Sequence, residues 1–405
     1  MFNPDHQPKV DFLKLEIEKN FGRRILSSRD CIYLAEELFQ KSEHKLNPNT
    51  LRRFFGLVAA KYPPSKATLD LLAQYCGYNS FSDIEYNQLN GERKPTDKLL
   101  LKYLVSIFKN TPVAHVNDDT YMNLVRETVI YLKNVPALIP DFQREIAKTK
   151  NGQEFYYEQF INIDKLDSYF GDGLHHYLKE KKTTESLIWA NSLLCFRYWL
   201  TGDHEKLEKS YNSLHLHFPN PHMHPFVIGR FFAAAIYHAQ EYNLPTNKIL
   251  EEARISFRSI KAGTDNYRSF PCFEYVFSEA LVLTGHFEEA LFYIRLAYAR
   301  QPIHASYIDS GFFITIEICK GLALAGTGEM VEALKIYSTI RPQHFYFLSK
   351  SYNMILLLTL CIKLNRCSQV QAKQMDLLIS ETGFFKFREV LSNLRLFKNQ
   401  DYSKN

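Results

Sequence analysis

The sequence predicts an all-α protein: a small domain of short packed helices, followed by an α-solenoid built from helical hairpins. Two patterns predict this class. Near the N-terminus, apolar residues recur three times at a helical spacing. In the C-terminal half, glycine, aromatic and small residues recur in a fixed order. We therefore expect residues 1–90 to form the small domain, residues 91–180 a helical connector, and residues 181–405 the hairpin array.

Three short amphipathic helices are predicted between residues 27 and 84. In each, the apolar residues follow the spacing i, i+3, i+4, i+7, which places them on one side of a helix. Helices this short must bury their apolar stripes against one another. The three sets are Cys31, Leu34, Ala35 and Leu38; Leu51, Phe54, Phe55 and Val58; and Leu69, Leu72, Ala73 and Cys76.

Start and stop signals delimit these helices. Ser27, with an acidic residue three positions later, is close to a capping box. Asn47 followed by Pro48 is typical of an N-cap and the first helical position. Ser65 is placed to start the third helix, and Gly77 follows it where a left-handed residue is needed.

The middle helix has a polar face that suits nucleic acid. Asn47, Asn49, Thr50, Arg52 and Arg53 lie off its predicted apolar stripe. Amide and guanidinium groups read base edges and bind phosphates. We expect the two arginines to bind phosphate or guanine. We expect Asn47, Asn49 and Thr50 to contact base edges or to anchor the start of the helix.

This part of the chain resembles the lambda-repressor-like helix-turn-helix family. The resemblance lies in "LAEEL" (34–38), "NPNTLRRFFG" (47–56) and "PSKATLDLLAQYCGYNSFSDI" (64–84). It implies that 47–56 is the recognition helix and that double-stranded DNA is the partner. The segment 40–46 is longer and more charged than the usual tight turn of that family.

Positive charge is concentrated in the same region. Residues 21–66 contain nine basic and four acidic residues, a net charge of +5 that equals the net charge of the whole chain. A localised basic face is the electrostatic signature of a polyanion partner, although a solvated basic surface is the plainer interpretation. The basic residues are Arg23, Arg24, Arg29, Lys41, Lys45, Arg52, Arg53, Lys61 and Lys66.

A helical connector is expected next. The run "NQLNGERKPTDK" (87–98) is polar and lacks a periodic apolar stripe, which is typical of a linker. Helices are predicted from about Thr96 or Asp97, and over 121–133 and 140–150.

The C-terminal half contains repeated helical hairpins. The order glycine, aromatic, alanine, large, alanine, proline begins at Gly285 and is echoed from Gly202 and Gly328. Further hairpin turns are predicted near Asn243 and Asn365. These units resemble tetratricopeptide-like repeats, although they are longer and more degenerate. Such hairpins stack into a solenoid with a concave surface, because no hairpin can bury its apolar face alone.

Aromatic residues in the array allow two interpretations. They are core residues packed between repeats, or they line a groove for a peptide or a protein helix. In repeats of this type the first helix of each hairpin lines the concave face. That placement makes Trp189, Phe196, Trp199, Tyr275 and Glu279 the candidate effector-binding residues.

The sequence gives no positive signal for an enzyme, a cofactor or a metal. Its seven cysteines are spread singly, which favours reduced thiols in a cytoplasmic protein. The histidines of "HLHFPNPHMHPF" (215–226) lack accompanying thiolates or carboxylates. No catalytic motif is recognisable, and we expect no signal peptide and no membrane span.

The arrangement as a whole is similar to that of peptide-responsive bacterial transcriptional regulators. That resemblance implies a DNA-binding head, a peptide or protein effector on the repeats, and a homodimer. The alternative is a cytoplasmic protein-interaction scaffold whose head does not bind DNA.

Overall fold

The computed structural model of the chain is helical throughout its described part, as the sequence predicts. The structure describes residues 7–42, 46–59, 64–78, 80–81, 84, 95–113, 118–263, 272–299 and 312–392. Lys45 and Lys61 of the predicted basic region, and most of the predicted linker at 87–98, lie outside these ranges.

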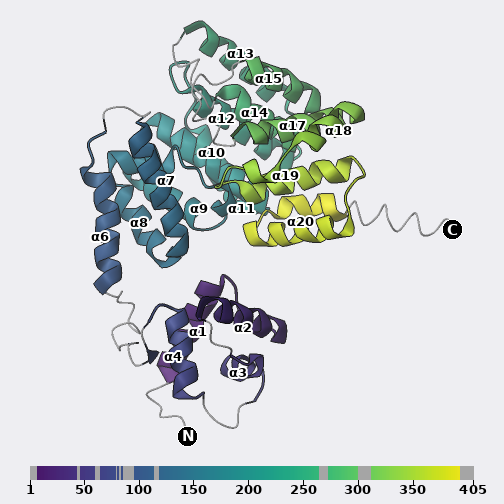
Figure 1. Cartoon of the computed structure of the whole chain (residues 1–405). Coiled ribbons are helices and arrows are strands. Elements are labelled where there is room, and N and C mark those ends of the chain that lie inside the picture. Colours follow the sequence, from purple (N-terminus) through teal and green to yellow (C-terminus); the bar gives the residue numbers. More distant parts are fainter. Residues whose placement is uncertain are drawn as a thin grey trace, which may run out of the picture. The chain divides into compact units, whose positions relative to one another are not determined.

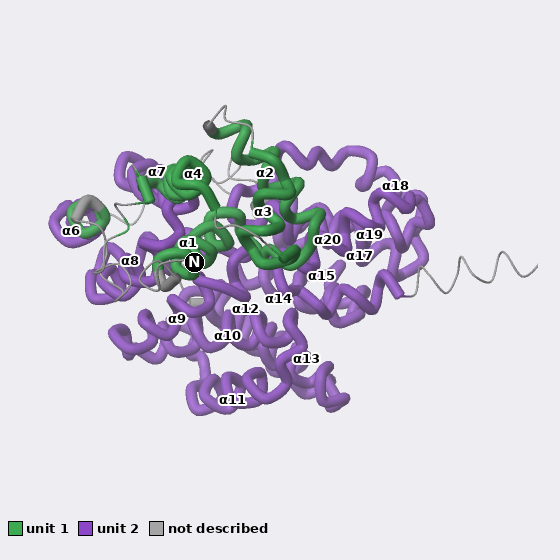
Figure 2. Tube along the Cα trace, turned by 90° about the horizontal axis from the view of Figure 1, so that it is seen from below, with its two compact units in different colours: residues 1–100 green, residues 101–405 purple. Residues whose placement is uncertain are grey.

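The chain divides into two compact units, residues 1–100 and 101–405 (Figure 2). Residues 101–180, which make up most of the connector predicted at 91–180, belong to the second unit together with the hairpins. The reason is a shared core. In α6 (Pro95–Asn110), Phe108 is buried and its ring packs edge-on against Phe142 and Tyr156. Tyr177, also within 101–180, packs on Trp189 of the first hairpin with ring centres 5.0 Å apart. The first helices of unit 2 are therefore packed elements and not a spacer.

Unit 1 contains α1 (Gln7–Phe21), α2 (Ser28–Ser42), α3 (Pro48–Phe54) and α4 (Lys66–Tyr75). One apolar core joins all four helices. Helix α1 is absent from the sequence prediction, yet Val10, Leu13 and Ile17 are buried in this core. Their spacing of i, i+3, i+7 was the signal that could have revealed it.

The predicted caps of unit 1 are confirmed. Ser27 Oγ accepts the amide N–H of Asp30 at 3.3 Å, and the Asp30 carboxylate accepts that of Ser27 at 2.9 Å. Ser65 caps α4, and Gly77 has a left-handed backbone with φ of +79°. The caps therefore set the start of each helix as local sequence predicts.

The predicted length of the middle helix is wrong. Helix α3 ends at Phe54, because Gly56 adopts a left-handed conformation with φ of +77° and the Leu57 amide bonds back to the carbonyl of Arg52. Leu51 and Phe54 are buried as predicted, whereas Val58 falls beyond the helix and is 48% exposed. The apolar stripe of this helix is one turn shorter than expected.

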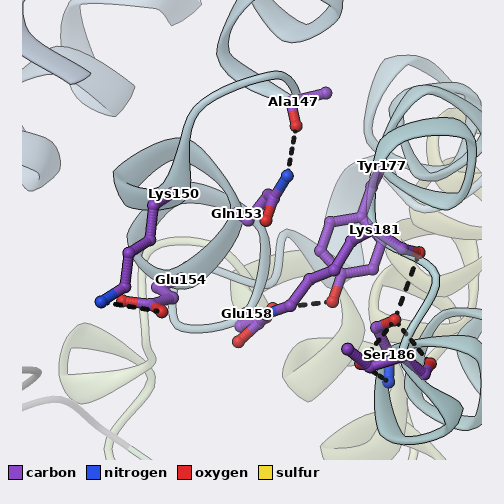
Figure 3. Close-up of polar contacts among 9 residues, drawn as sticks. Ala147, Lys150, Gln153, Glu154, Glu158, Tyr177, Lys181 and Ser186 are labelled. Atoms are coloured by element: carbon purple, nitrogen blue, oxygen red, sulfur yellow. Dashed lines mark hydrogen bonds and ion pairs between the residues drawn. The ribbon is translucent and has the colours of Figure 1, made fainter. Parts of the chain in front are cut away.

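Unit 2 continues after α6 with α7 (Asp119–Asn134), α8 (Ile139–Ile146), a π-helical turn at Gly152–Tyr157 and α9 (Tyr169–Glu180). Figure 3 shows how side chains fix the π-helical segment. Gln153 donates to the carbonyl of Ala147 at 2.7 Å. Just after the turn, Glu158 accepts from the Tyr177 hydroxyl at 2.7 Å and from Lys181 at 2.6 Å. These contacts tie the turn to α9.

Five helix pairs follow in the described part of unit 2 (Figure 1). The first helices of successive pairs pack on one another, so that α10 lies against α12, α12 against α14, α14 against α17, and α17 against α19. The pairs are α10 (Thr184–Thr201) with α11 (His204–His215), α12 (Pro225–Glu241) with α13 (Asn247–Gly263), α14 (Phe273–Leu283) with α15 (Phe287–Ala299), α17 (Phe312–Gly326) with α18 (Met330–Thr339), and α19 (Lys350–Lys363) with α20 (Gln369–Thr382).

The five predicted hairpin turns are confirmed. Each turn residue has a left-handed backbone: φ is +73° at Gly202, +53° at Asn243, +84° at Gly285, +90° at Gly328 and +54° at Asn365. In every turn, the next amide N–H donates to the carbonyl five residues before it, over 2.8–3.0 Å. This bond is the signature of a Schellman motif, so one backbone geometry ends the first helix of all five pairs.

The last helix pair packs back on the segment before the first. Asp164, ahead of α9, accepts the amide N–H groups of Ser351 and Tyr352 at 3.0 and 2.9 Å. Lys386, which follows α20, pairs with Glu241 of α12 at 2.9 Å. The array is therefore closed on itself across the first helices of its pairs.

We predict that Gly285→Ala lowers the free energy of unfolding by about 1 kcal/mol, the cost of a left-handed backbone for an L-residue. An added Cβ meets nothing within 4 Å, so backbone strain is the only cause. Urea unfolding measures this change. As a control, Asn243→Gly at the corresponding turn should leave the free energy of unfolding within about 0.5 kcal/mol of wild type. Equal stability of Gly285→Ala and wild type would show that this turn does not depend on the left-handed conformation.

Candidate functional site

The predicted recognition helix is α3, and the residue just before it, Asn47, caps its start. The Asn47 side chain accepts the amide N–H of Asn49 at 2.9 Å, and Pro48 occupies the first helical position. Of the two roles expected for Asn47, the structure shows the anchoring one. Its amide oxygen is occupied by the cap, so recognition by α3 depends on the residues that follow.

The other predicted residues share one face of α3 but differ in exposure. Asn49 and Arg53 are exposed, while Thr50 and Arg52 are half-buried. Arg52 donates to Asn49 Oδ1 at 2.8 Å, and its Nε is buried without a hydrogen-bond partner among the described residues. Its charge opposes the rise that burial causes in the pKa of Cys31. Arg52 therefore lies near Cys31 of α2, and the Arg53 side chain is exposed.

The charge around α3 differs from the sequence prediction. Arg23 pairs with Asp30 at 3.1 Å and Lys41 with Glu37 at 2.7 Å, so these cations are neutralised locally. Lys14 of α1, outside residues 21–66, lies 5.9 Å from the ring centre of Phe54, and it pairs with Asp11 at 3.4 Å. Among these cations, the exposed Arg53 therefore remains the positive group that α3 itself presents.

A second candidate site lies inside unit 2. The five predicted effector residues are all buried, with exposed fractions between 0 and 8%. They do not line an open concave face, which corrects the groove interpretation and agrees with core packing. The physical reason is the closure of the array, which brings the first helices of the pairs together around a common interior.

Four of the five residues nonetheless gather in one cluster. The ring of Tyr237 stacks against Phe196 at 5.2 Å and against Trp199 at 4.7 Å between centroids. Glu279 accepts a hydrogen bond from the Tyr352 hydroxyl at 2.9 Å. Tyr275, one turn before Glu279 on α14, is buried in the same region. Trp189 is separate, because it packs on Tyr177 at 5.0 Å.

Part of this group is called here the inner polar cluster and comprises Phe196, Arg230, Tyr237, Glu279 and Tyr352, of which Phe196 and Glu279 are predicted effector residues. Burial raises the pKa of the Glu279 carboxyl, and the positive charge of Arg230 opposes that rise. Arg230 lies 5.5 Å from the ring centre of Phe196. The cluster therefore places a cation from α12 and an acid from α14 among aromatic rings contributed by α10, α12 and α19.

Sequence reasoning missed Arg230, Tyr237 and Tyr352. A signal for Arg230 was available, because it is the one charged residue in the otherwise apolar run "PFVIGRFFAAAIY" (225–237). A helix that is apolar on all sides is buried, and a charge within it needs a partner. Tyr352 carried no such signal, because its partners are distant in sequence.

The histidine-rich segment has a structural use at one position. His224 Nδ1 accepts the amide N–H of Phe226 at 3.2 Å and so caps α12. Within the described ranges, no three His, Cys, Asp or Glu side chains are grouped as metal ligands.

Comparison with known proteins gives no relatives: no family model matches the chain, and neither a curated protein nor a solved structure matches it significantly. In the part of the chain that the structure describes, no helix has the length and apolar character needed to cross a membrane.

We predict that Glu279→Gln gains stability relative to wild type as the pH rises from 4 to 8. A carboxyl whose pKa is raised in the folded state stabilises the fold below its unfolded pKa, and that contribution is lost as the pH rises through the folded pKa. Urea unfolding across this pH range tests it, with the exposed Glu332→Gln as the control for loss of a carboxyl. If the difference in free energy of unfolding between Glu279→Gln and wild type stayed constant with pH, the Glu279 carboxyl would not be buried as the structure shows.

Proposed function

We propose that the chain is a DNA-binding transcriptional regulator, in which unit 1 is a helix-turn-helix head and α3 enters the major groove. One observation carries the proposal: α3 buries Leu51 and Phe54 in the core of unit 1 while Asn49 and Arg53 remain exposed. A helix held by one face presents the other face in a fixed orientation. That is the arrangement a recognition helix needs.

The exposed groups suit the chemistry of a base-pair edge. Arginine donates to the O6 and N7 atoms of guanine or to phosphate, and asparagine matches the N6 and N7 atoms of adenine. The hydrogen bond from Arg52 to Asn49 restricts both side chains before binding. In this proposal Arg53 contributes the direct contact, and Arg52 and Asn49 act as a pair.

Unit 2, in the proposal, is a tetratricopeptide-like array that binds a peptide or protein effector or forms a homodimer. Two heads of a dimer bind half-sites about 34–36 Å apart. A change in the array that altered the separation of the heads would therefore change the affinity for DNA. The repeated left-handed turns and the stacking of the first helices support the repeat interpretation.

The test measures binding of the full chain to 30-base-pair DNA duplexes of random sequence. Fluorescence anisotropy gives the binding constant K at several salt concentrations. We expect affinity to fall steeply with salt. Arg52→Ala combined with Arg53→Ala should reduce the slope of log K against log salt by about 2, because each neutralised phosphate contributes roughly 0.9 to that slope. Lys335→Ala with Lys373→Ala removes the same charge from exposed positions of unit 2.

The control variant should bind as wild type does. If both double variants weaken binding equally, or if the wild-type chain does not bind DNA at low salt, α3 is not a recognition helix.

The second candidate function is a protein-interaction scaffold. It is favoured by one observation: Ile32, Tyr33 and Phe39 of α2 are 38%, 46% and 51% exposed and share one side of that helix. Exposed apolar groups of this kind mark protein contacts. Absence of DNA binding in the anisotropy experiment would favour this alternative.

A further inference from the structure

The inward side of α12 carries hydrogen-bond donors that have no acceptor among the described residues. Arg230 and Tyr237 are seven residues apart and therefore lie on one side of the helix. They are 5% and 1% exposed. The Nε and Nη1 atoms of Arg230 and the hydroxyl of Tyr237 are buried without a hydrogen-bond partner among the described residues.

A buried guanidinium needs more than its aromatic neighbours supply. Arg230 lies over the rings of Phe196 and Phe226, at 5.5 and 5.2 Å from their centres, and such contacts stabilise a cation only in part. Arg230 interacts electrostatically with the carboxyl group of Glu279, but that group already accepts a hydrogen bond from the hydroxyl of Tyr352. Burying a charge that lacks a hydrogen-bonded partner is costly. An anion bound at Arg230 would remove that cost.

We propose that Arg230 and Tyr237 bind the carboxylate of a small ligand with an apolar body. The donors fit an oxyanion, since the guanidinium and the phenol hydroxyl both donate. The neighbouring rings of Phe196 and Phe226 would contact the apolar body of such a ligand. A single negative charge is favoured over the double charge of phosphate, because the acid Glu279 belongs to the same cluster.

The proposal goes beyond DNA binding, because the site is built entirely from residues of unit 2. It also gives Phe196 and Glu279, predicted from sequence as effector-binding residues, a specific place beside the bound ligand. Arg230 and Glu279 are each 5% exposed, so the bound ligand would be almost wholly enclosed by the array.

The test uses the full chain, isothermal titration and thermal unfolding, with benzoate, acetate and inorganic phosphate as probes. A short apolar peptide with a free or an amidated C-terminus distinguishes a peptide carboxylate from a free organic acid. The variants are Arg230→Met and Tyr237→Phe. Arg254→Met is the control, because Arg254 of α13 pairs with Glu289 at a more exposed position.

We expect benzoate to bind the wild-type chain saturably and to raise its unfolding temperature. Tyr237→Phe should weaken binding about tenfold, the effect of one hydrogen bond to a charged group. Arg230→Met should abolish binding and still fold, with an unfolding temperature equal to or above that of wild type, because it removes an unpaired buried charge. Arg254→Met should bind benzoate as wild type does.

Three results would overturn the proposal. They are no binding of benzoate to the wild-type chain, equal binding by Arg230→Met, or binding of phosphate alone. None of them bears on DNA binding, because no DNA is present.

Discussion

The carboxylate of Asp164 holds the start of α19, and the interior of unit 2 depends on this contact. The first amides of a helix have no partner within it. Asp164 accepts two of them, from Ser351 and Tyr352, while its own amide donates to the carbonyl of Leu348 at 3.0 Å. Burial raises the pKa of Asp164, and these amides and the nearby Lys133 oppose that rise. Segments nearly 190 residues apart in the chain are thereby joined.

Closure at Asp164 places Tyr352 in the interior of the array. Its hydroxyl then donates to Glu279 on α14, and its ring meets Phe196 of α10 edge-on at 6.0 Å. Helices from the two ends of the array thus share one core. An open solenoid would leave Phe196 and Glu279 on a concave surface, whereas here they are buried, and Arg230 is buried with them.

Local features could be predicted from the sequence, because each depends on a few neighbouring residues. Asn243 and Asn365 are turn residues of the same geometry as Gly285, since asparagine tolerates a left-handed backbone. The caps at Ser27 and Ser65 follow for the same reason. Val58 shows the limit: its spacing fits a helix, but Gly56 ends α3 before it, and the stop signal outweighs the apolar pattern.

Features that depend on distant residues could not be predicted. Asp164 and Tyr352 follow no sequence spacing that pairs them. The inner polar cluster therefore emerges only with the fold, although aromatic and acidic positions on α10 and α14 pointed to its members one by one. The residue types of α3 were predictable, but their separate roles required the structure. Asn47 caps the helix, whereas Arg53 is exposed.

Amide hydrogen exchange of the full chain, comparing wild type with Asp164→Ala, tests the closure most directly. If Asp164 holds the array closed, exchange accelerates together at the start of α19 and around Phe196 and Glu279, while α2 and α4 of unit 1 keep their protection. Acceleration confined to residues 162–166, with α19 and the inner polar cluster unchanged, would contradict it.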